Sequence, residues 1–167
     1  MEAKIDSNRL LLRSLDPKHD DLSGYLSWMR DTKNSPFIQS VNHGMTLESL
    51  ESYIAEKNRS KDALLLGIFD KVSSIHVGNV KLEPILPGQD ACLGIFIGSN
   101  EMRGKTFGFD TIQLLSNFAK TEYSLKSIYL GVNVNNHAAM KLYQKLGFSP
   151  DIIYGNSFDD IRMRILL

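Results

Sequence analysis

Two short stretches of the sequence carry residue types whose spacing suits the binding of a diphosphate and the transfer of a proton. The first, RGKTFG from Arg103 to Gly108, lies between an apolar run and a segment with the periodicity of a helix. The N–H groups at a helix N-terminus, the positive end of its dipole and neighbouring cations together suit a diphosphate. The second stretch, from Asn136 to Phe148, contains Tyr143. Its phenol has an ordinary pKa of about 10 and can therefore donate a proton at neutral pH.

The Gly-Lys-Thr triplet in the first stretch raises an alternative, the phosphate-binding loop of a nucleotide hydrolase. That loop requires the pattern G-x-x-x-x-G-K-S/T. Here five residues separate Gly98 from Gly104, which is one too many. The later apolar segment SIYLGV also lacks a carboxylate that could hold magnesium. A P-loop phosphotransferase is therefore the weaker interpretation, and a surface turn that binds nothing is a further alternative.

Taken together, the two stretches are similar to motifs of the GNAT superfamily of acyl-CoA-dependent N-acetyltransferases. RGKTFG resembles the family's Q/R-x-x-G-x-G/A pyrophosphate loop, and Asn136-x-x-Ala139-x-x-x-Tyr143-x-x-x-Gly147-Phe148 resembles its C-terminal motif. The likeness extends through HVGNVKLEPI and ACLGIFIGSNEMRGKTFG. YLSWMRD resembles the first helix of the branch that includes ribosomal-protein N-terminal acetyltransferases, and the central segment is similar to acetyltransferases of sugar amines.

The resemblance implies acetyl-CoA as the co-substrate, bound in a cleft where two parallel strands, LGIFIG and IYLGVNV, splay apart. It implies Tyr143 as the proton donor to the CoA sulfur. Backbone N–H groups of Phe96 or Ile97, freed where the strands part, are expected to hold the thioester carbonyl oxygen as it gains charge. No metal is expected. The expected cofactor-binding residues are Phe96, Ile97, Arg103, Gly104, Lys105, Thr106, Phe107, Gly108, Asn136, Ala139 and Tyr143.

Two positions depart from the family pattern. Thr106 stands where the pyrophosphate loop usually has its middle glycine, so we expect weaker or differently angled binding, with the hydroxyl as a donor to phosphate. Cys92 stands where many relatives have a glutamate that serves as general base. A thiol with a pKa of about 8.5 is a poor base at neutral pH, so Cys92 is interpreted as a small buried residue. His43 and Asp90 are the remaining candidates, and the base is left unassigned.

The composition indicates one globular domain over residues 1–167, with 43% hydrophobic and 23% charged residues. The 19 basic and 19 acidic residues give no broad field that would attract nucleic acid or an anionic membrane. The N-terminal apolar run is too short for a signal-peptide core, and the single cysteine cannot form an intrachain disulfide. We therefore expect a cytoplasmic protein without nucleic-acid or membrane partners, and a homodimer stays open.

The hydrophobic patterns predict a mixed α/β (α+β) domain, a twisted sheet with helices on both faces. The resemblance implies that the sheet is mostly antiparallel, with one splayed parallel pair forming the acyl-CoA cleft. The side chains of Phe107 and Leu142 are assigned to the core. Helices are predicted over residues 21–30, 46–60, 107–118 and 136–147, and strands over 8–15, 63–70, 75–85, 91–98, 126–134, 148–154 and 159–167.

The function that follows is transfer of an acetyl group by direct attack of a primary amine on acetyl-CoA. The amine could belong to an amino sugar or sugar nucleotide, a polyamine, an antibiotic or a protein N-terminus. A non-catalytic acyl-CoA sensor is the main alternative, and a P-loop phosphotransferase is the weaker one.

Overall fold

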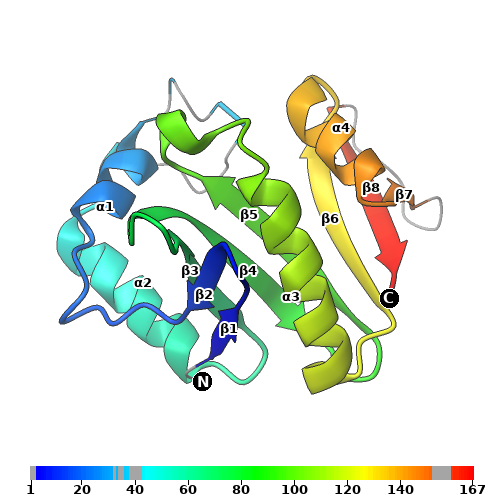
Figure 1. The fold of residues 1–167 in the computed structure, drawn as a ribbon, viewed down its shortest axis with the longest axis horizontal. Coiled ribbons are helices and arrows are strands. Elements are labelled where there is room, and N and C mark those ends of the chain that lie inside the picture. Colours follow the sequence, from blue (N-terminus) through cyan, green and yellow to red (C-terminus); the bar gives the residue numbers. More distant parts are fainter. Residues whose placement is uncertain (1–2, 32, 34–35, 38–42, 152–158) are drawn as a thin grey trace.

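The computed structural model of the protein describes residues 3–31, 33, 36–37, 43–151 and 159–167. Within them, an eight-stranded sheet has the strand order β1-β2-β3-β4-β5-β6-β8-β7 (Figure 1). Neighbouring strands are antiparallel except for β5 and β6, which are parallel. The predicted mixed, mostly antiparallel sheet with one parallel pair is therefore confirmed.

The N-terminal part contains a hairpin and two helices. β1 (Lys4–Asp6) pairs with β2 (Leu10–Arg13), and α1 (Ser23–Arg30) and α2 (Leu47–Arg59) follow. The sequence predicted only the second strand, because three residues with one buried side chain carry no detectable period. The expected cap of α2 is present, since the Thr46 side chain accepts a hydrogen bond from the backbone N–H three residues later.

The middle of the chain is the predicted meander. It consists of β3 (Leu64–Asp70), β4 (His76–Ile85) and β5 (Asp90–Ile97), and a short 3₁₀ helix, η1 (Asn100–Met102), follows β5. β5 stays paired with β4 as far as Ile97. The backbone N–H and C=O groups of β5 that point toward β4 are therefore hydrogen-bonded along most of the strand.

The C-terminal part alternates helices and strands. It contains α3 (Phe107–Tyr123), β6 (Ser127–Asn133), α4 (His137–Lys145) and β8 (Asp160–Leu166). Gly147, with a φ of 94°, follows the end of α4 in the left-handed conformation expected there.

The strand predicted over residues 148–154 is described only as β7 (Ser149–Pro150). Residues 152–158 lie outside the described part of the chain.

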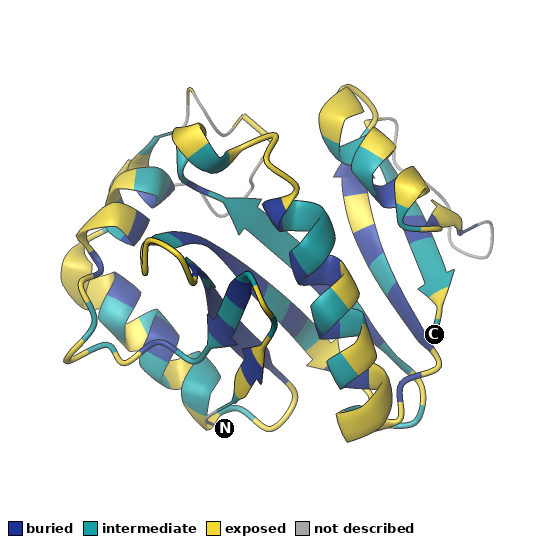
Figure 2. Ribbon diagram, viewed as in Figure 1, coloured by how far each residue is buried: buried dark blue, intermediate teal, exposed yellow. Residues whose placement is uncertain are grey.

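Two hydrophobic cores cover the two faces of the sheet. Alternate side chains of a strand point to opposite faces. Leu64 and Leu66 of β3 therefore belong to the core that contains α3, whereas Leu65 packs with Leu50 of α2. α4 packs on the α3 side of the sheet through Tyr143. Figure 2 shows buried residues concentrated on the strands and on the helix sides turned toward them.

β5 and β6 are paired only at one end. Their register joins Asp90 to Ser127, Ala91 to Ile128 and Cys92 to Tyr129, and beyond these pairs the strands diverge (Figure 1). β6 remains paired with β8 along its whole length. The divergence therefore opens a gap between two halves of one sheet.

A hydrogen-bonded cluster around Arg164 of β8 holds the paired end closed. Arg164 Nη1 donates to Asp90 Oδ2 at 2.8 Å and to Ser127 Oγ at 2.6 Å, which joins β8 to β5 and β6. Its Nε donates to Asp151 Oδ2 at 2.8 Å, and the Asp151 side chain is only 4% exposed. Such a charged network links three strands, and removal of Arg164 would leave the nearly buried Asp151 carboxylate without this charged partner.

The substitution Arg164→Met tests this cluster, because methionine keeps an apolar stem of similar length and removes every donor. We expect the free energy of unfolding in urea to fall by about 2 kcal/mol. Lys120→Met, at an exposed site in the last turn of α3, should change it by less than about 0.5 kcal/mol. Equal unfolding midpoints for wild type and Arg164→Met would contradict the assignment.

Candidate active site

A cleft of about 970 Å³ lies where β5 and β6 part, and residues from both faces of the sheet line it. One wall consists of the start of α3 together with α4, and the other of residues from α1, α2, β3 and β4. The cleft contains all the predicted cofactor-binding residues except Lys105, namely Phe96, Ile97, Arg103, Gly104, Thr106, Phe107, Gly108, Asn136, Ala139 and Tyr143. Segments that are far apart in the sequence therefore meet in one cavity.

The loop before α3 turns through two left-handed residues. Gly104 has a φ of 76° and Thr106 has a φ of 66°. Glycine adopts this conformation at no steric cost, whereas threonine pays for its Cβ. The departure from the family pattern at Thr106 therefore changes the residue and keeps a backbone conformation that glycine favours.

Arg9, in the turn of the N-terminal hairpin, holds this loop in place. Its Nη1 donates to Thr106 Oγ1 at 2.5 Å and to Asp110 Oδ2 at 3.1 Å, and its Nη2 donates to the Lys105 carbonyl at 2.6 Å. The guanidinium also lies 4.2 Å from the ring centre of Phe107. We call Arg9 with these three hydrogen-bond partners the Arg9 clamp.

The clamp also occupies the Thr106 hydroxyl, which the sequence offered as a donor to phosphate. In the structure this hydroxyl donates to Asp110 Oδ2 at 2.9 Å and accepts from Arg9. A hydroxyl has one proton, so this geometry leaves none for a phosphate oxygen. The backbone N–H groups at the start of α3 remain as donors at the loop.

The backbone of β5 directs one predicted N–H group toward the cleft. Gly98 donates its N–H to Val77 of β4 at 3.0 Å. Successive residues of a strand direct their backbone groups to opposite sides, so Ile97 directs its groups away from β4 and Phe96 toward it. The Ile97 carbonyl accepts a hydrogen bond from Arg103 Nε at 2.9 Å, which agrees with this direction. The alternation therefore favours the Ile97 N–H over that of Phe96 as a donor in the cleft.

α4 presents Tyr143 to the same cleft. Asn136 caps the helix, because its side chain accepts a hydrogen bond from the Ala139 N–H at 3.2 Å. The Tyr143 side chain packs against Phe148 and the residue is 8% exposed. Burial raises the pKa of its phenol to about 12. Among the described residues the hydroxyl has no hydrogen-bond partner, so it remains available as a proton donor.

Neither candidate for the general base, His43 or Asp90, lines the cleft, and Cys92, which stands at the position of the family's glutamate, does not line it either. Asp90 is the first residue of β5, which runs from the closed end toward the cleft. Its carboxylate therefore lies at the closed end, where it pairs with Arg164. Cys92 belongs to the last pair before the strands part, and burial raises the pKa of its thiol further above neutrality. Among the described lining residues the one carboxylate is Asp160, which accepts from Asn133 Nδ2 at 3.2 Å.

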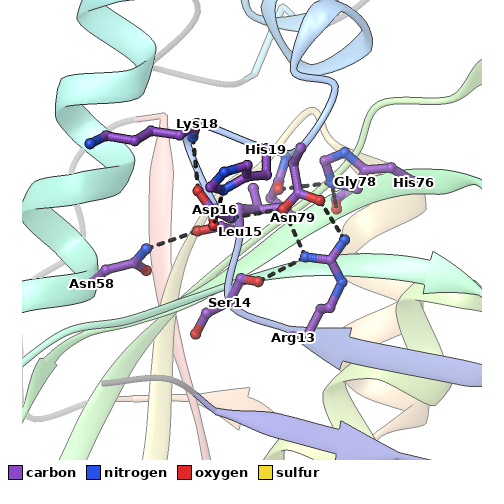
Figure 3. A network of polar contacts seen from close by, with 11 residues as sticks. Arg13, Ser14, Leu15, Asp16, Lys18, His19, Asn58, His76, Gly78 and Asn79 are labelled. Carbon is purple, nitrogen blue, oxygen red and sulfur yellow. Dashed lines mark hydrogen bonds and ion pairs between the residues drawn. The ribbon is translucent and has the colours of Figure 1, made fainter.

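A polar network supports the wall of the cleft formed by β4 (Figure 3). Arg13 of β2 makes two hydrogen bonds to Asp20, at 2.7 and 2.6 Å, and fixes the segment that leads into α1. His76 Nε2 lies 2.8 Å from the Gly78 carbonyl oxygen and 3.1 Å from Asn79 Oδ1. The sequence analysis found neither Arg9 nor Asn79, because an arginine beside leucines and an asparagine within a strand carry no motif.

Within the described residues, no group of three or more histidine, cysteine, aspartate or glutamate side chains is placed to hold a metal ion. No helix of this part of the chain has both the length and the apolar character needed to cross a membrane.

The fold and the cleft are those of an acyl-CoA-dependent acetyltransferase. Residues 9–149 match the family model described as "Acetyltransferase (GNAT) domain", so the chain belongs to the GNAT acetyltransferase family. The resemblance predicted from the two motifs is therefore confirmed.

Solved structures of the same fold include several acetyltransferases. The ribosomal-protein acetyltransferase RimL in complex with coenzyme A is 15% identical, with a TM-score of 0.82 and coverage of 99% of this chain and 98% of that chain. Spermidine N-acetyltransferase from Vibrio cholerae, in complex with CoA and spermine, is 24% identical, with a TM-score of 0.80 and coverage of 96% of both chains. A GNAT-family acetyltransferase from Bacillus anthracis is 18% identical, with a TM-score of 0.80 and coverage of 98% of both chains.

The Arg9 clamp predicts that CoA affinity depends on the N-terminal hairpin. In Arg9→Ala the loop loses three hydrogen bonds and its left-handed threonine loses support, so we expect the Kd for CoA, measured by calorimetry, to rise about tenfold.

Adding Thr106→Gly to Arg9→Ala should recover part of the lost affinity, because glycine adopts the left-handed conformation freely. Arg59→Ala, in the last turn of α2, is the matched control and should bind CoA as the wild type does. Unchanged CoA affinity in Arg9→Ala would show that the clamp has no part in binding.

Proposed function

We propose that the protein transfers the acetyl group of acetyl-CoA to a primary amine by direct attack, without an acetylated enzyme intermediate. The observation that carries this proposal is the cleft at the parting of β5 and β6, which joins the loop before α3 and Tyr143 to a pocket on the opposite face. Two substrates that enter from opposite faces meet there. Family membership supports acetyl-CoA as one of them.

CoA is proposed to place its pyrophosphate against the backbone from Arg103 to Gly108. The N–H groups at the start of α3 have no acceptors within the helix, and the helix dipole favours negative charge there. A Cβ at Gly108 would lie 3.1 Å from Leu142 Cδ2, so any larger residue there would have to displace this side chain of α4. The pantetheine then runs between β5 and β6 toward Ile97.

The proposed chemistry uses one backbone group and one side chain. The Ile97 N–H donates to the thioester oxygen, which gains negative charge as the amine attacks the carbonyl carbon. The tetrahedral intermediate collapses when the C–S bond breaks, and the Tyr143 hydroxyl gives its proton to the departing thiolate. Cys92 forms no acyl intermediate, because its thiol has a raised pKa and does not line the cleft.

The acceptor is a small-molecule amine or a protein N-terminus. The similar structures include a spermidine acetyltransferase and a ribosomal-protein acetyltransferase, so the shared fold accommodates both kinds of acceptor. A non-catalytic acyl-CoA sensor would bind CoA and leave every amine unchanged. A cytoplasmic location remains a prediction from the sequence.

Calorimetry and turnover together test this proposal. CoA should bind in the micromolar range and ATP with magnesium more weakly, since the loop lacks the P-loop spacing. An amine panel with acetyl-CoA and thiol detection should then show CoA release that depends on the amine. Equal or tighter binding of ATP would contradict the CoA site, and CoA binding without turnover of any amine would favour the sensor.

Tyr143→Phe isolates the proton donor, because it removes only the hydroxyl and keeps the ring that packs on Phe148. We expect the rate of the chemical step to fall by about 10²–10⁴-fold with little change in CoA affinity. Tyr123→Phe, at the end of α3 and outside the cleft lining, is the matched control and should keep full activity. A Tyr143→Phe enzyme with an unchanged chemical step would reduce Tyr143 to a packing residue.

A further inference from the structure

We propose that the acceptor amine carries an oxygen that accepts a hydrogen bond close to its nitrogen, and no second positive charge, and that the Asn79 side-chain amide binds that oxygen. This inference rests on the proposed acetyl transfer and names the class of amine. An α-amino amide, as in a peptide N-terminus, and an amino sugar share this chemistry. A polyamine does not, because its other nitrogens are protonated donors.

The first step is the protonation of His76. Its Nε2 lies 2.8 Å from the Gly78 carbonyl oxygen, and a carbonyl can only accept, so this nitrogen carries a proton. Because the ring is buried, its pKa is lowered and it is neutral at neutral pH, with that single proton on Nε2.

The second step is the orientation of Asn79. The same His76 Nε2 lies 3.1 Å from the Asn79 side chain, and a nitrogen that donates requires an acceptor there, which is Oδ1 (Figure 3). The Asn79 amide nitrogen, Nδ2, is therefore turned away from His76. Oxygen and nitrogen cannot exchange places without putting two donors against each other.

The third step is the unmet hydrogen bond. Asn79 lines the cleft and is 5% exposed, and its Nδ2 is buried without a hydrogen-bond partner among the described residues. A buried N–H group without an acceptor costs free energy, which a bound oxygen recovers. Asn79 lies opposite Phe96 on the neighbouring strand, one residue before Ile97, so an oxygen bound by Nδ2 would lie on the acceptor side of the strand that carries the Ile97 N–H.

The surroundings of Asn79 also disfavour a second ammonium group. The acceptor side of the cleft is formed by aromatic and apolar side chains of the described residues, among them Tyr25, Met29, Phe37, Tyr53, Leu65 and Phe96. No described carboxylate lines that side, and the one lysine there, Lys81, has its ammonium group paired with Glu83 Oε2 at 3.0 Å. The undescribed residues between 32 and 42 contain no aspartate or glutamate in the sequence. A polycation would lose its hydration there without gaining a counter-ion.

Steady-state kinetics with acetyl-CoA and four amines test the proposal. Serinamide and glucosamine each carry an oxygen beside the amine, butylamine has the charge without the oxygen, and spermidine has additional charges. We expect kcat/KM for serinamide or glucosamine to exceed that of butylamine and spermidine by at least about tenfold. The two oxygen-bearing amines distinguish a peptide-like acceptor from a sugar. Butylamine or spermidine turned over as well as both would overturn the proposal.

Asn79→Asp exchanges the donor for a carboxylate of the same shape. It should lower kcat/KM for the preferred oxygen-bearing amine by about ten- to a hundredfold and raise that for spermidine, while CoA affinity is unchanged. Asn135→Asp, at an exposed site outside the cleft lining, is the matched control and should leave the preference as in the wild type.

Asn79→Ala provides a second test of the role of Asn79 if the aspartate variant does not fold. It should reduce the advantage of the oxygen-bearing amine over butylamine, and an unchanged ratio would overturn the role of Asn79. CoA binding without turnover of any amine would contradict the acetyl transfer itself. Turnover that ignores the neighbouring oxygen would contradict only this inference.

Discussion

The incomplete pairing of β5 with β6 is the constraint on which the site depends. If the two strands stayed paired along their length, their backbone N–H groups would be hydrogen-bonded to each other's carbonyl groups, and no cavity would join the two faces of the sheet. Three pairs and the Arg164 cluster close one end, and the extended pairing of β6 with β8 draws the other end away from β5. The Ile97 N–H and the space beside Tyr143 are consequences of this geometry.

The loop before α3 shows how a change in one motif residue is compensated from a distant part of the chain. Thr106 keeps a left-handed backbone that costs free energy for a β-branched residue. Arg9 offsets this cost through hydrogen bonds to the hydroxyl and the neighbouring carbonyl. The N-terminal hairpin therefore becomes part of the proposed CoA site, and the family motif is preserved in its geometry more than in its letters.

Local periodicity predicted most elements, including the meander and the stripe of α3, because each buries a repeating apolar face. The two motifs predicted the lining residues of the α3 and α4 wall, whereas residues of the opposite wall such as Asn79 were not predicted. The sequence could not reveal contacts such as that of Arg9 with Thr106, which join residues 97 positions apart and depend on strand order. Asp90 is a candidate base from the sequence, and only the pairing of β5 with β6 shows that it lies at the closed end, away from the cleft.

The apolar walls on the acceptor side of the cleft affect how the proposed amine substrate would lose its proton. An amine must lose a proton before it attacks, and none of the described side chains that line this side is a carboxylate or a histidine. Aromatic and apolar walls disfavour the charged form of a bound amine and so lower its pKa. In the proposed reaction the walls would therefore favour binding of the neutral amine, which gives its proton to water before it binds. The same low-polarity surroundings increase the free-energy cost of an unpaired donor such as Asn79 Nδ2. The walls that would favour a neutral amine therefore also favour an acceptor whose oxygen can bind this donor.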